Sequence, residues 1–411
     1  MSEAREGNEI SISMEAFTDA FHEEISSNYS FTTSAGCSIF EVPTIVTRHK
    51  ESAYYPYTFS IGPFHYNKPP LMKTQQFKVK YLIDLISRSQ KTLGHFTDAI
   101  SEIKKQARES YDGPIEIGDE EFIKVMVLDG CFIVELFRKY DDERLRDRDD
   151  PIFTTSCVHQ FLYHDLILLE NQVPWLVLEI LFDMTKTNTE KTLVQLAIVF
   201  FANIFADTPL PSTAVPDNHG SKHILDLLRN CLVSSSRIDE GERAWQLMPS
   251  ATRIKDAGIK FKKCIVEKSI LDIRFEKGIL EMSPLFIQET TEPIFRNLII
   301  FEQCCPNVAS VITSYAILMD NLIKTREDVE ILCQNGVIDN WLNVEDVRRL
   351  FNQLSYHTNI KDNFFVRLTT DVNRYCQGRW PRYRLFVMRL WALSIFVAIC
   401  TFFQTVFAII K

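Results

Sequence analysis

Acidic side chains interrupt two long apolar stretches of this 411-residue chain. Asp129 and Glu135 lie within VMVLDGCFIVELF at 125–137, and Asp165 and Glu170 lie within DLILLENQVPW at 165–175. A carboxylate in apolar surroundings is costly unless it is paired or hydrogen-bonded, and burial without a partner raises its pKa. These residues are therefore candidates either for acid–base chemistry or for holding the fold together.

The catalytic interpretation pairs Asp129 or Glu135 with Asp165 or Glu170, beside His164, as general acid and general base. The structural interpretation has these acids accept hydrogen bonds from backbone N–H groups, or pair with arginines such as Arg296, so that helix is fixed against helix. We favour the structural interpretation because polar contacts between helices are common and no nucleophile stands beside these acids. No catalytic residue is assigned.

Amide side chains belong to the same predicted structural set. Asn171 and Gln172 precede Pro174, where a helix break frees backbone groups that amide side chains can satisfy. A further basic and amide pair lies within the apolar string FRNLIIFEQ at 295–303. The predicted structural polar residues are thus Asp129, Glu135, Asp165, Glu170, Asn171, Gln172, Arg296 and Asn297.

Metal-binding and catalytic signatures are absent from the sequence. His159 and His164 differ in helical register, and His219 and His223 adjoin a proline- and glycine-containing stretch, so neither pair is expected to hold a metal. The ten cysteines include no C-x-x-C pair. Gly-rich phosphate loops, G-x-S-x-G, H-E-x-x-H and EF-hand loops are also missing. We expect no metal and no cofactor, and we lean towards a protein that is not an enzyme.

The elements that position these side chains are mostly helical. Phe77, Tyr81 and Leu85 recur on one face of a helix, with Lys78 and Lys80 expected to face water. The charged run DDERLRDRDDP at 141–151 is typical of a solvated loop. Further helices are predicted at 120–140, 159–170, after Pro174, and at 189–206, 308–324, 326–334, 344–355 and 361–376.

One segment has strand periodicity instead. Residues 270–282 alternate apolar and charged side chains around Lys277-Gly278, which predicts a small β-hairpin. The expected fold class is mainly α: a large helical cytosolic domain with a minor β-hairpin and a single C-terminal transmembrane helix. The predicted organisation is a mobile arm at 1–36, a helical domain at 37–385 with an internal linker at 207–221, and a transmembrane helix at 390–410.

The predicted transmembrane helix, 390–410, contains no charged residue. At about 1.5 Å per residue, it reaches roughly 30 Å, the thickness of the hydrocarbon core of a bilayer. Arginines near a span remain in the cytosol, and the N-terminus has no apolar signal segment. We expect a single-pass, tail-anchored protein of the plasma membrane or endoplasmic reticulum, with membrane lipid as one partner and its N-terminal domain in the cytosol. The flanking residues are Arg379, Arg382, Arg384 and Arg389.

Composition indicates which other partners the chain is not expected to bind and how large a core it can form. The net charge is −9 and the basic residues are scattered rather than gathered in a stripe, so nucleic acid is not an expected partner. With 46% hydrophobic residues, the chain is able to bury a large core.

Several long strings resemble a plant family, the domain of unknown function 247. They are GPFHY at 62–66, the two acid-interrupted strings above, FRNLIIFEQ, and QTVFAII at 404–410. The resemblance covers about nine-tenths of the chain, from Ile39 onwards, and implies a plant membrane protein with a C-terminal anchor. This chain has Thr74-Gln75 where the family usually has Met-Glu, and a shorter segment between Trp380 and the anchor.

The resemblance implies no established activity, although some grass relatives are implicated as male determinants of self-incompatibility. Together with the missing catalytic signatures, it favours a membrane-tethered interaction or recognition module with an unknown protein partner. Two alternatives remain: an unmarked enzyme that uses the buried carboxylates, and a recognition determinant of the self-incompatibility type.

Overall fold

The computed structural model of this protein describes most of the chain after residue 36. The described residues are 18, 36–48, 50–187, 190–202, 204, 220–236, 246–264, 269–356, 358–359 and 362–410, without the side chains of 379–386 and 403–410. The predicted N-terminal arm, 1–36, and the predicted linker, 207–221, therefore lie almost entirely outside the described residues.

The N-terminal half is built around one buried helix, α5 (Asp119–Asp141). It is apolar around most of its circumference, as a helix surrounded by other helices must be. Four helices pack against it: α3 (Gln75–Ser89), α4 (Leu93–Arg108), α8 (Trp175–Asp183) and α9 (Leu193–Phe200). The remaining elements of this half are α2 (Thr44–Thr47), η1 (Glu51–Ala53), η2 (Pro69–Thr74), η3 (Glu143–Leu145), α6 (Pro151–Thr154), α7 (Ser156–Leu166) and α10 (Ile224–Ser234).

A glycine sets the close approach of α5 to α8. Gly130 lies in the middle of α5, and a Cβ atom built there would lie 2.4 Å from Leu181 Cδ1 and 3.3 Å from Val177 Cγ1. Such contacts are too short for a side chain in a close-packed interior. The glycine, which is unfavourable in a helix interior, is therefore needed for packing rather than for helix formation.

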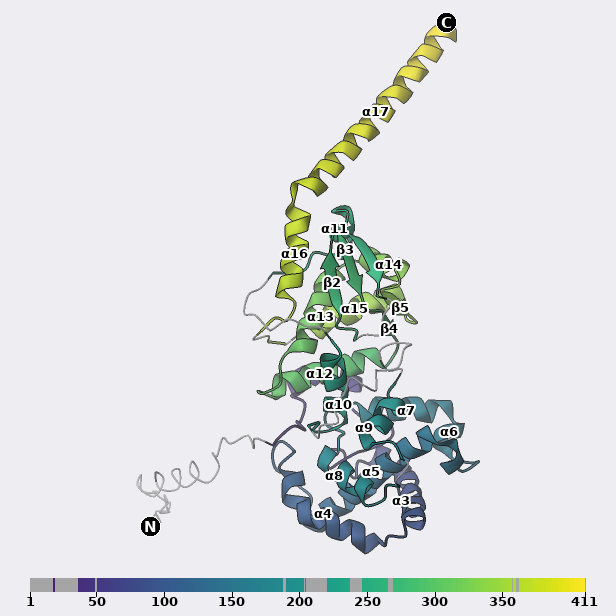
Figure 1. Ribbon diagram of the computed structural model, residues 1–411, viewed down its shortest axis with the longest axis vertical. Helices are drawn as coiled ribbons and strands as arrows, with labels where there is room; N and C mark the ends of the chain where they lie inside the picture. The colour runs from purple at the N-terminus through teal and green to yellow at the C-terminus, as the bar shows by residue number, and fades with distance from the viewer. Residues whose placement is uncertain are drawn as a thin grey trace, which may run out of the picture.

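The C-terminal half combines helices with two small sheets, counted over the described residues. Figure 1 shows it between the α5 bundle and the C-terminal helix. Its helices are α11 (Ala251–Asp256), α12 (Thr291–Cys304), α13 (Val311–Leu322), α14 (Arg326–Gln334), α15 (Val344–Leu354) and α16 (Val366–Gln377). Its strands are β1 (Lys260–Lys263), β2 (Ile273–Glu276), β3 (Ile279–Met282), β4 (Leu285–Ile287) and β5 (Ile338–Asn340).

The predicted hairpin is present as β2 and β3. These strands pair antiparallel with Glu276 opposite Ile279, and the turn between them places Lys277 at φ 50° and Gly278 at φ 78°. Two consecutive positive φ angles are typical of the tight turns that suit the twist of a hairpin. The sequence did not predict the remaining strands: β1 adds to β3 in parallel, and β4 pairs with β5 in parallel.

The mainly helical fold class is confirmed, with small sheets, but two local expectations are wrong. The helix expected at 189–206 is shorter, with α9 ending at Phe200. The charged run 141–151 is not simply solvated, because Asp150 is fully buried. Its side chain accepts hydrogen bonds from Tyr81 Oη and the Ile152 N–H, and these contacts offset the cost of burying the charge.

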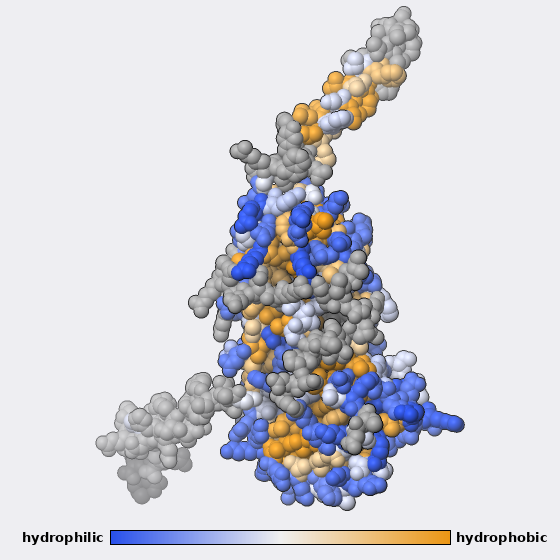
Figure 2. All heavy atoms as spheres, viewed as in Figure 1, coloured by the Kyte–Doolittle hydropathy of each residue, from blue (hydrophilic) through white to orange (hydrophobic). Residues whose placement is uncertain are grey.

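The last helix, α17 (Arg379–Ile410), extends away from the rest of the protein (Figure 1). Its large apolar side chains, including Leu393 and Phe396, are exposed. In Figure 2 the described part of this helix is largely orange, with pale-blue patches between the hydrophobic side chains. Over the part of the chain that the structure describes, no helix combines the length and apolarity needed to cross a membrane. Of the predicted flanking arginines, Arg389 is exposed, whereas the side chains of Arg379, Arg382 and Arg384 lie outside the described residues.

Candidate functional site

Most of the predicted polar residues surround one irregular segment, residues 38–66. This extended segment crosses the helices of the N-terminal half and contains only short helical turns. Backbone groups without a helix or sheet must find other partners when they are buried. The acids and amides of the apolar strings supply these partners, so they fix the extended segment against helices rather than helix against helix.

Asp165 binds the centre of the extended segment. This carboxylate, at the end of α7, is fully buried and accepts hydrogen bonds from three successive N–H groups, those of Tyr57 at 2.7 Å, Thr58 at 2.9 Å and Phe59 at 2.7 Å. The Thr58 hydroxyl adds a fourth at 3.1 Å. Hydrogen bonds to an ionised acceptor are roughly twice as strong as neutral ones. The Asp165 carboxylate is thus fully engaged in binding the backbone.

The adjacent His164 is enclosed by the same contacts. Its Nδ1 lies 3.0 Å from Asp165 Oδ1, and its ring stacks on Tyr57 with 3.8 Å between centroids. Its Nε2 is buried and has no hydrogen-bond partner among the described residues. General acid–base catalysis needs a nitrogen that can reach the substrate. The structure therefore brings His164 and Asp165 together without giving them an accessible reacting atom.

Asp129 anchors the other end of the extended segment, together with a buried lysine. Its Oδ2 accepts the Gly62 N–H at 2.8 Å and its Oδ1 lies 2.5 Å from Lys78 Nζ, which also donates to the Ser60 carbonyl. Lys78 is only 1% exposed, so the expectation that it faces water is wrong. Burial raises the pKa of the Asp129 carboxyl, while Lys78 and the Gly62 N–H oppose this rise.

Gly62 has to be a glycine for this contact. Its φ is 73°, in the left-handed region, and an added Cβ would lie 2.3 Å from the Gln172 carbonyl oxygen. Only a residue without a side chain adopts this conformation while approaching another backbone so closely. The glycine of the GPFHY string thus allows Asp129 to bind the chain at that point.

Glu170 and Asn171 also bind the extended segment, Glu170 near its start and Asn171 between the groups bound by Asp165 and Asp129. Glu170 Oε1 accepts the Val42 N–H at 2.6 Å, and its Oε2 lies 3.0 Å from His65 Nε2 without hydrogen-bond alignment. Asn171 Oδ1 accepts the Ile61 N–H at 2.6 Å, and its Nδ2 donates to the carbonyl oxygens of Phe59 and Asp165. Asn171 therefore hydrogen-bonds backbone groups of both the extended segment and the end of α7.

Gln172 and Asn297 complete the set. Gln172 Nε2 donates to the carbonyl oxygens of Leu166 and Leu168, both at 2.8 Å, and so satisfies the end of α7. Asn297 of α12 accepts the Leu169 N–H at 2.9 Å and donates to the Ala53 carbonyl at 2.8 Å. Through Asn297 the C-terminal half also binds the extended segment.

The charged partners of Glu135 and Arg296 lie outside the predicted set, although Arg296 lies beside Tyr54 of the extended segment. Arg296 Nε pairs with Glu292 at 2.8 Å, not with any of the four predicted acids. Glu135 lies on the face of α5 that meets α3, where Arg88 Nη1 donates to it at 2.5 Å. Glu135 thus binds the Arg88 side chain of α3, whereas Asp129, Asp165 and Glu170 bind N–H groups of the extended segment. The structure therefore does not assemble the four acids into one site.

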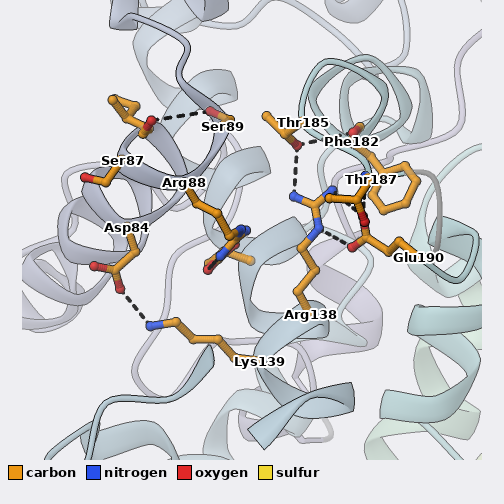
Figure 3. Close-up of polar contacts among 12 residues, drawn as sticks. Asp84, Ser87, Arg88, Ser89, Arg138, Lys139, Phe182, Thr185, Thr187 and Glu190 are labelled. Carbon is orange, nitrogen blue, oxygen red and sulfur yellow. Dashed lines mark hydrogen bonds and ion pairs between the residues drawn. The ribbon is translucent and has the colours of Figure 1, made fainter. Parts of the chain in front are cut away.

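A second polar cluster surrounds the end of α5 and is shown in Figure 3. Lys139 Nζ pairs with Asp84 at 2.7 Å, and Arg138 pairs with Glu190 and donates to Thr185 Oγ1 at 2.9 Å. Lys139 also lies 4.1 Å from the centroid of the Tyr81 ring, a cation–π contact. These pairs join α5 to α3 and to the α8–α9 connection, which is a structural function.

Glu302 is a buried acid that our sequence analysis did not single out. It lies in the FRNLIIFEQ string and accepts the N–H groups of Ile312 at 3.0 Å and Thr313 at 2.8 Å, as well as Arg229 Nε at 2.9 Å. Burial raises the pKa of its carboxyl, and Arg229 and these N–H groups oppose the rise. The signal that marked Asp129, a charge inside an apolar string, was present here too.

The hydrogen bonds of these acids limit the chemistry that their carboxylates can perform. Asp129, Asp165 and Glu302 each accept hydrogen bonds from two or more donors, so their lone pairs are largely occupied. Over the residues that the structure describes, no group of three or more His, Cys, Asp or Glu side chains could hold a metal ion. Of the histidine pairs considered from the sequence, His223 is buried and His219 lies outside the described residues.

A solvent-accessible cleft lies between the two halves, and none of the buried acids lines it. Its volume is about 490 Å³, within the usual range of ligand pockets. One wall comes from α7 and the other from the β4–α12 connection and the end of β5. Gln160 Nε2 donates across the cleft to Glu289 Oε2 at 3.1 Å. The lining residues are His159, Gln160, Tyr163, Ile204, Gln288, Glu289, Thr290, Trp341 and Leu342.

Comparison with known proteins identifies relatives but no solved structure. The profile of a family described as plant protein of unknown function, the domain of unknown function 247, matches residues 39–411. The UPF0481 protein At3g47200 of Arabidopsis thaliana is 28% identical over 382 residues, covering 85% of this chain and 80% of the relative. The UPF0481 protein At3g02645 of the same plant is 22% identical over 446 residues, covering 84% and 83%. No solved structure matches the chain.

Proposed function

The chain belongs to the domain of unknown function 247 family of plant proteins, and on this basis we propose that it is a recognition module tethered to a plant membrane by α17. In this proposal the helical body faces the cytosol and binds a protein partner. The buried acids have a structural function: they hold the extended segment 38–66 in place.

The observation that carries the binding function is the state of the buried acids. Asp165 accepts four hydrogen bonds, three of them from successive backbone N–H groups. A general base needs a lone pair that faces the substrate. Acids that are occupied by the protein's own backbone favour a binding protein over an enzyme that uses these carboxylates.

The tether is supported by the character of α17. Its large apolar side chains from Met388 to Phe402 are between 47% and 68% exposed. Leaving such side chains in water is unfavourable by roughly 25 cal/mol for each Å² of apolar surface. Insertion into lipid would remove this surface from water, with the arginines before it on the cytosolic side.

The test uses the full chain with a tag at each terminus, expressed in plant cells. Microsomes are washed with alkaline carbonate and then treated with protease before and after detergent. We expect the protein to stay in the membrane pellet and the N-terminal tag to be digested without detergent. Release into the supernatant would contradict the tether, and protection of the N-terminal tag would contradict the orientation.

A further inference from the structure

The cleft between α7 and β5 has a distinctive chemistry. Trp341 lies at its edge with 77% of its surface exposed, and only one edge-to-face contact, with Phe286, supports the ring among the described residues. An exposed indole next to a cleft is typical of residues that anchor a partner, because it buries a large apolar area on binding. The exposed face of the Trp341 ring is therefore available to stack against a ligand.

The second feature of the cleft is its charge. Glu289 is the single acidic side chain among the described residues that line it, and Gln160 is the described donor that reaches one of its oxygens, Oε2. No described residue donates to Glu289 Oε1; Glu289 lies in the connection between β4 and α12, two elements labelled in Figure 1. The cleft therefore offers a carboxylate oxygen to a ligand.

The remaining polar groups add no positive charge. Burial, together with the nearby Arg146, lowers the pKa of His159, so its imidazole is neutral at pH 7. Gln288 and Thr290 contribute neutral groups, and the whole chain carries a net charge of −9. This balance disfavours phosphate and carboxylate ligands and favours a cation.

We propose that the cleft binds an arginine side chain of a basic protein segment, with the guanidinium stacked on Trp341 and paired with Glu289. A guanidinium is planar, stacks on indole and donates two parallel hydrogen bonds to a carboxylate, whereas an ammonium does neither as well. The inference rests on the proposed recognition function and names the chemistry of its partner.

The test measures peptide binding to the full-length protein in detergent micelles by isothermal titration calorimetry. The probes are acetyl-Gly-Arg-Gly-amide, its lysine counterpart and its citrulline counterpart, which has the shape of arginine without the charge. We expect saturable binding of the arginine peptide, several-fold weaker binding of the lysine peptide, and at least tenfold weaker binding of the citrulline peptide.

Variants locate the binding to the cleft. Glu289→Gln, which keeps the contact with Gln160, and Trp341→Ala should each weaken arginine binding about tenfold without changing the melting temperature, because both side chains are exposed. The matched control is Glu276→Gln, an exposed glutamate at the hairpin turn, which should bind as the wild type does.

Equal affinity for arginine and citrulline, or unchanged binding by Glu289→Gln, would overturn the assignment, as would the absence of saturable binding. Each of these results leaves the carbonate and protease experiment untouched. Failure of the cleft assignment is therefore distinguishable from failure of the membrane tether.

Discussion

At the scale of single residues, the recurring feature is a buried carboxylate that accepts hydrogen bonds from backbone N–H groups outside its own helix. Asp165, Asp129 and Glu302 all act in this way, with partners on the extended segment or at the start of α13. Such an acceptor stabilises an irregular segment, because the N–H groups of that segment have no hydrogen-bond partner in a helix or sheet and an unpaired buried N–H is costly. This feature explains why acids sit inside apolar strings.

Asp165→Asn should destabilise the fold strongly. The amide keeps the shape but replaces one charged oxygen with an NH₂ group that faces N–H donors, so we expect the free energy of unfolding to fall by about 2–4 kcal/mol. Urea unfolding followed by circular dichroism measures this change. The matched control, Asp183→Asn, removes an exposed pair with Lys186 and should cost less than about 0.5 kcal/mol. Equal effects of the two substitutions would refute the anchoring function.

His223 should make the protein less stable in mild acid. Burial lowers the pKa of this histidine to about 4, because its Nδ1 accepts the Asp226 N–H and the ring is completely enclosed. Between pH 6.5 and about 4 the unfolded chain binds a proton that the folded chain does not, so stability falls as the pH falls through this window. The loss attributable to His223 is about 3 kcal/mol.

The measurement is the free energy of unfolding at several pH values between 7 and 4, in the wild type and in His223→Asn. Other acids also titrate in this window, so the difference between the two proteins isolates the histidine. We expect a shallower pH dependence in the variant. Parallel curves would show that His223 does not contribute.

At the scale of elements, the extended segment 38–66 behaves as part of the core although little of it is regular. Its backbone is held by side chains from α5, α7 and α12, and residues such as Phe59 and Ile61 are fully buried. Segments of this kind usually lie on the surface and are mobile. Here the buried acceptors replace the hydrogen bonds that a sheet would supply.

This arrangement predicts slow hydrogen exchange in the extended segment. The amide protons of Tyr57, Phe59, Ile61 and Gly62 should exchange as slowly as those in the middle of α5, because release requires breaking buried hydrogen bonds. Hydrogen–deuterium exchange with mass spectrometry measures this, with the exposed charged residues 147–149 as the fast reference. Exchange at the rate of that reference would mean that the acids do not hold the segment.

At the scale of the whole molecule, two parts differ in how they meet solvent. The body buries its apolar residues around α5 and α12, whereas the described part of α17 leaves them exposed (Figure 2). Four arginines precede the apolar stretch 390–410, which contains no acidic residue, and both features are consistent with the proposed tether. These arginines are Arg379, Arg382, Arg384 and Arg389. The body and α17 should therefore respond differently to added charge.

Ile399→Lys combined with Phe402→Lys, two exposed positions near the centre of the span, should release the protein from membranes. Each lysine at the centre of a span costs about 2.5–3.5 kcal/mol, whereas each apolar residue contributes about −0.3 to −0.6 kcal/mol, so the pair shifts insertion by about 6–8 kcal/mol. The fraction of protein in the carbonate-washed pellet measures this. Val79→Lys with Ile83→Lys, exposed apolar positions on α3, should leave that fraction unchanged. Retention of the α17 variant would contradict the tether.

The sequence by itself determined the mainly helical class, the β2–β3 hairpin and the importance of acids within apolar strings. These features follow from local periodicity, turn residues and the cost of burying charge, all of which are properties of neighbouring residues. Tertiary structure decided which donor each acid binds: the N–H groups of Gly62 and Phe59 come from 67 and 106 residues away from Asp129 and Asp165. Lys78 shows the physical reason, because a lysine beside an apolar stripe is expected in water until a buried carboxylate from another helix compensates its charge.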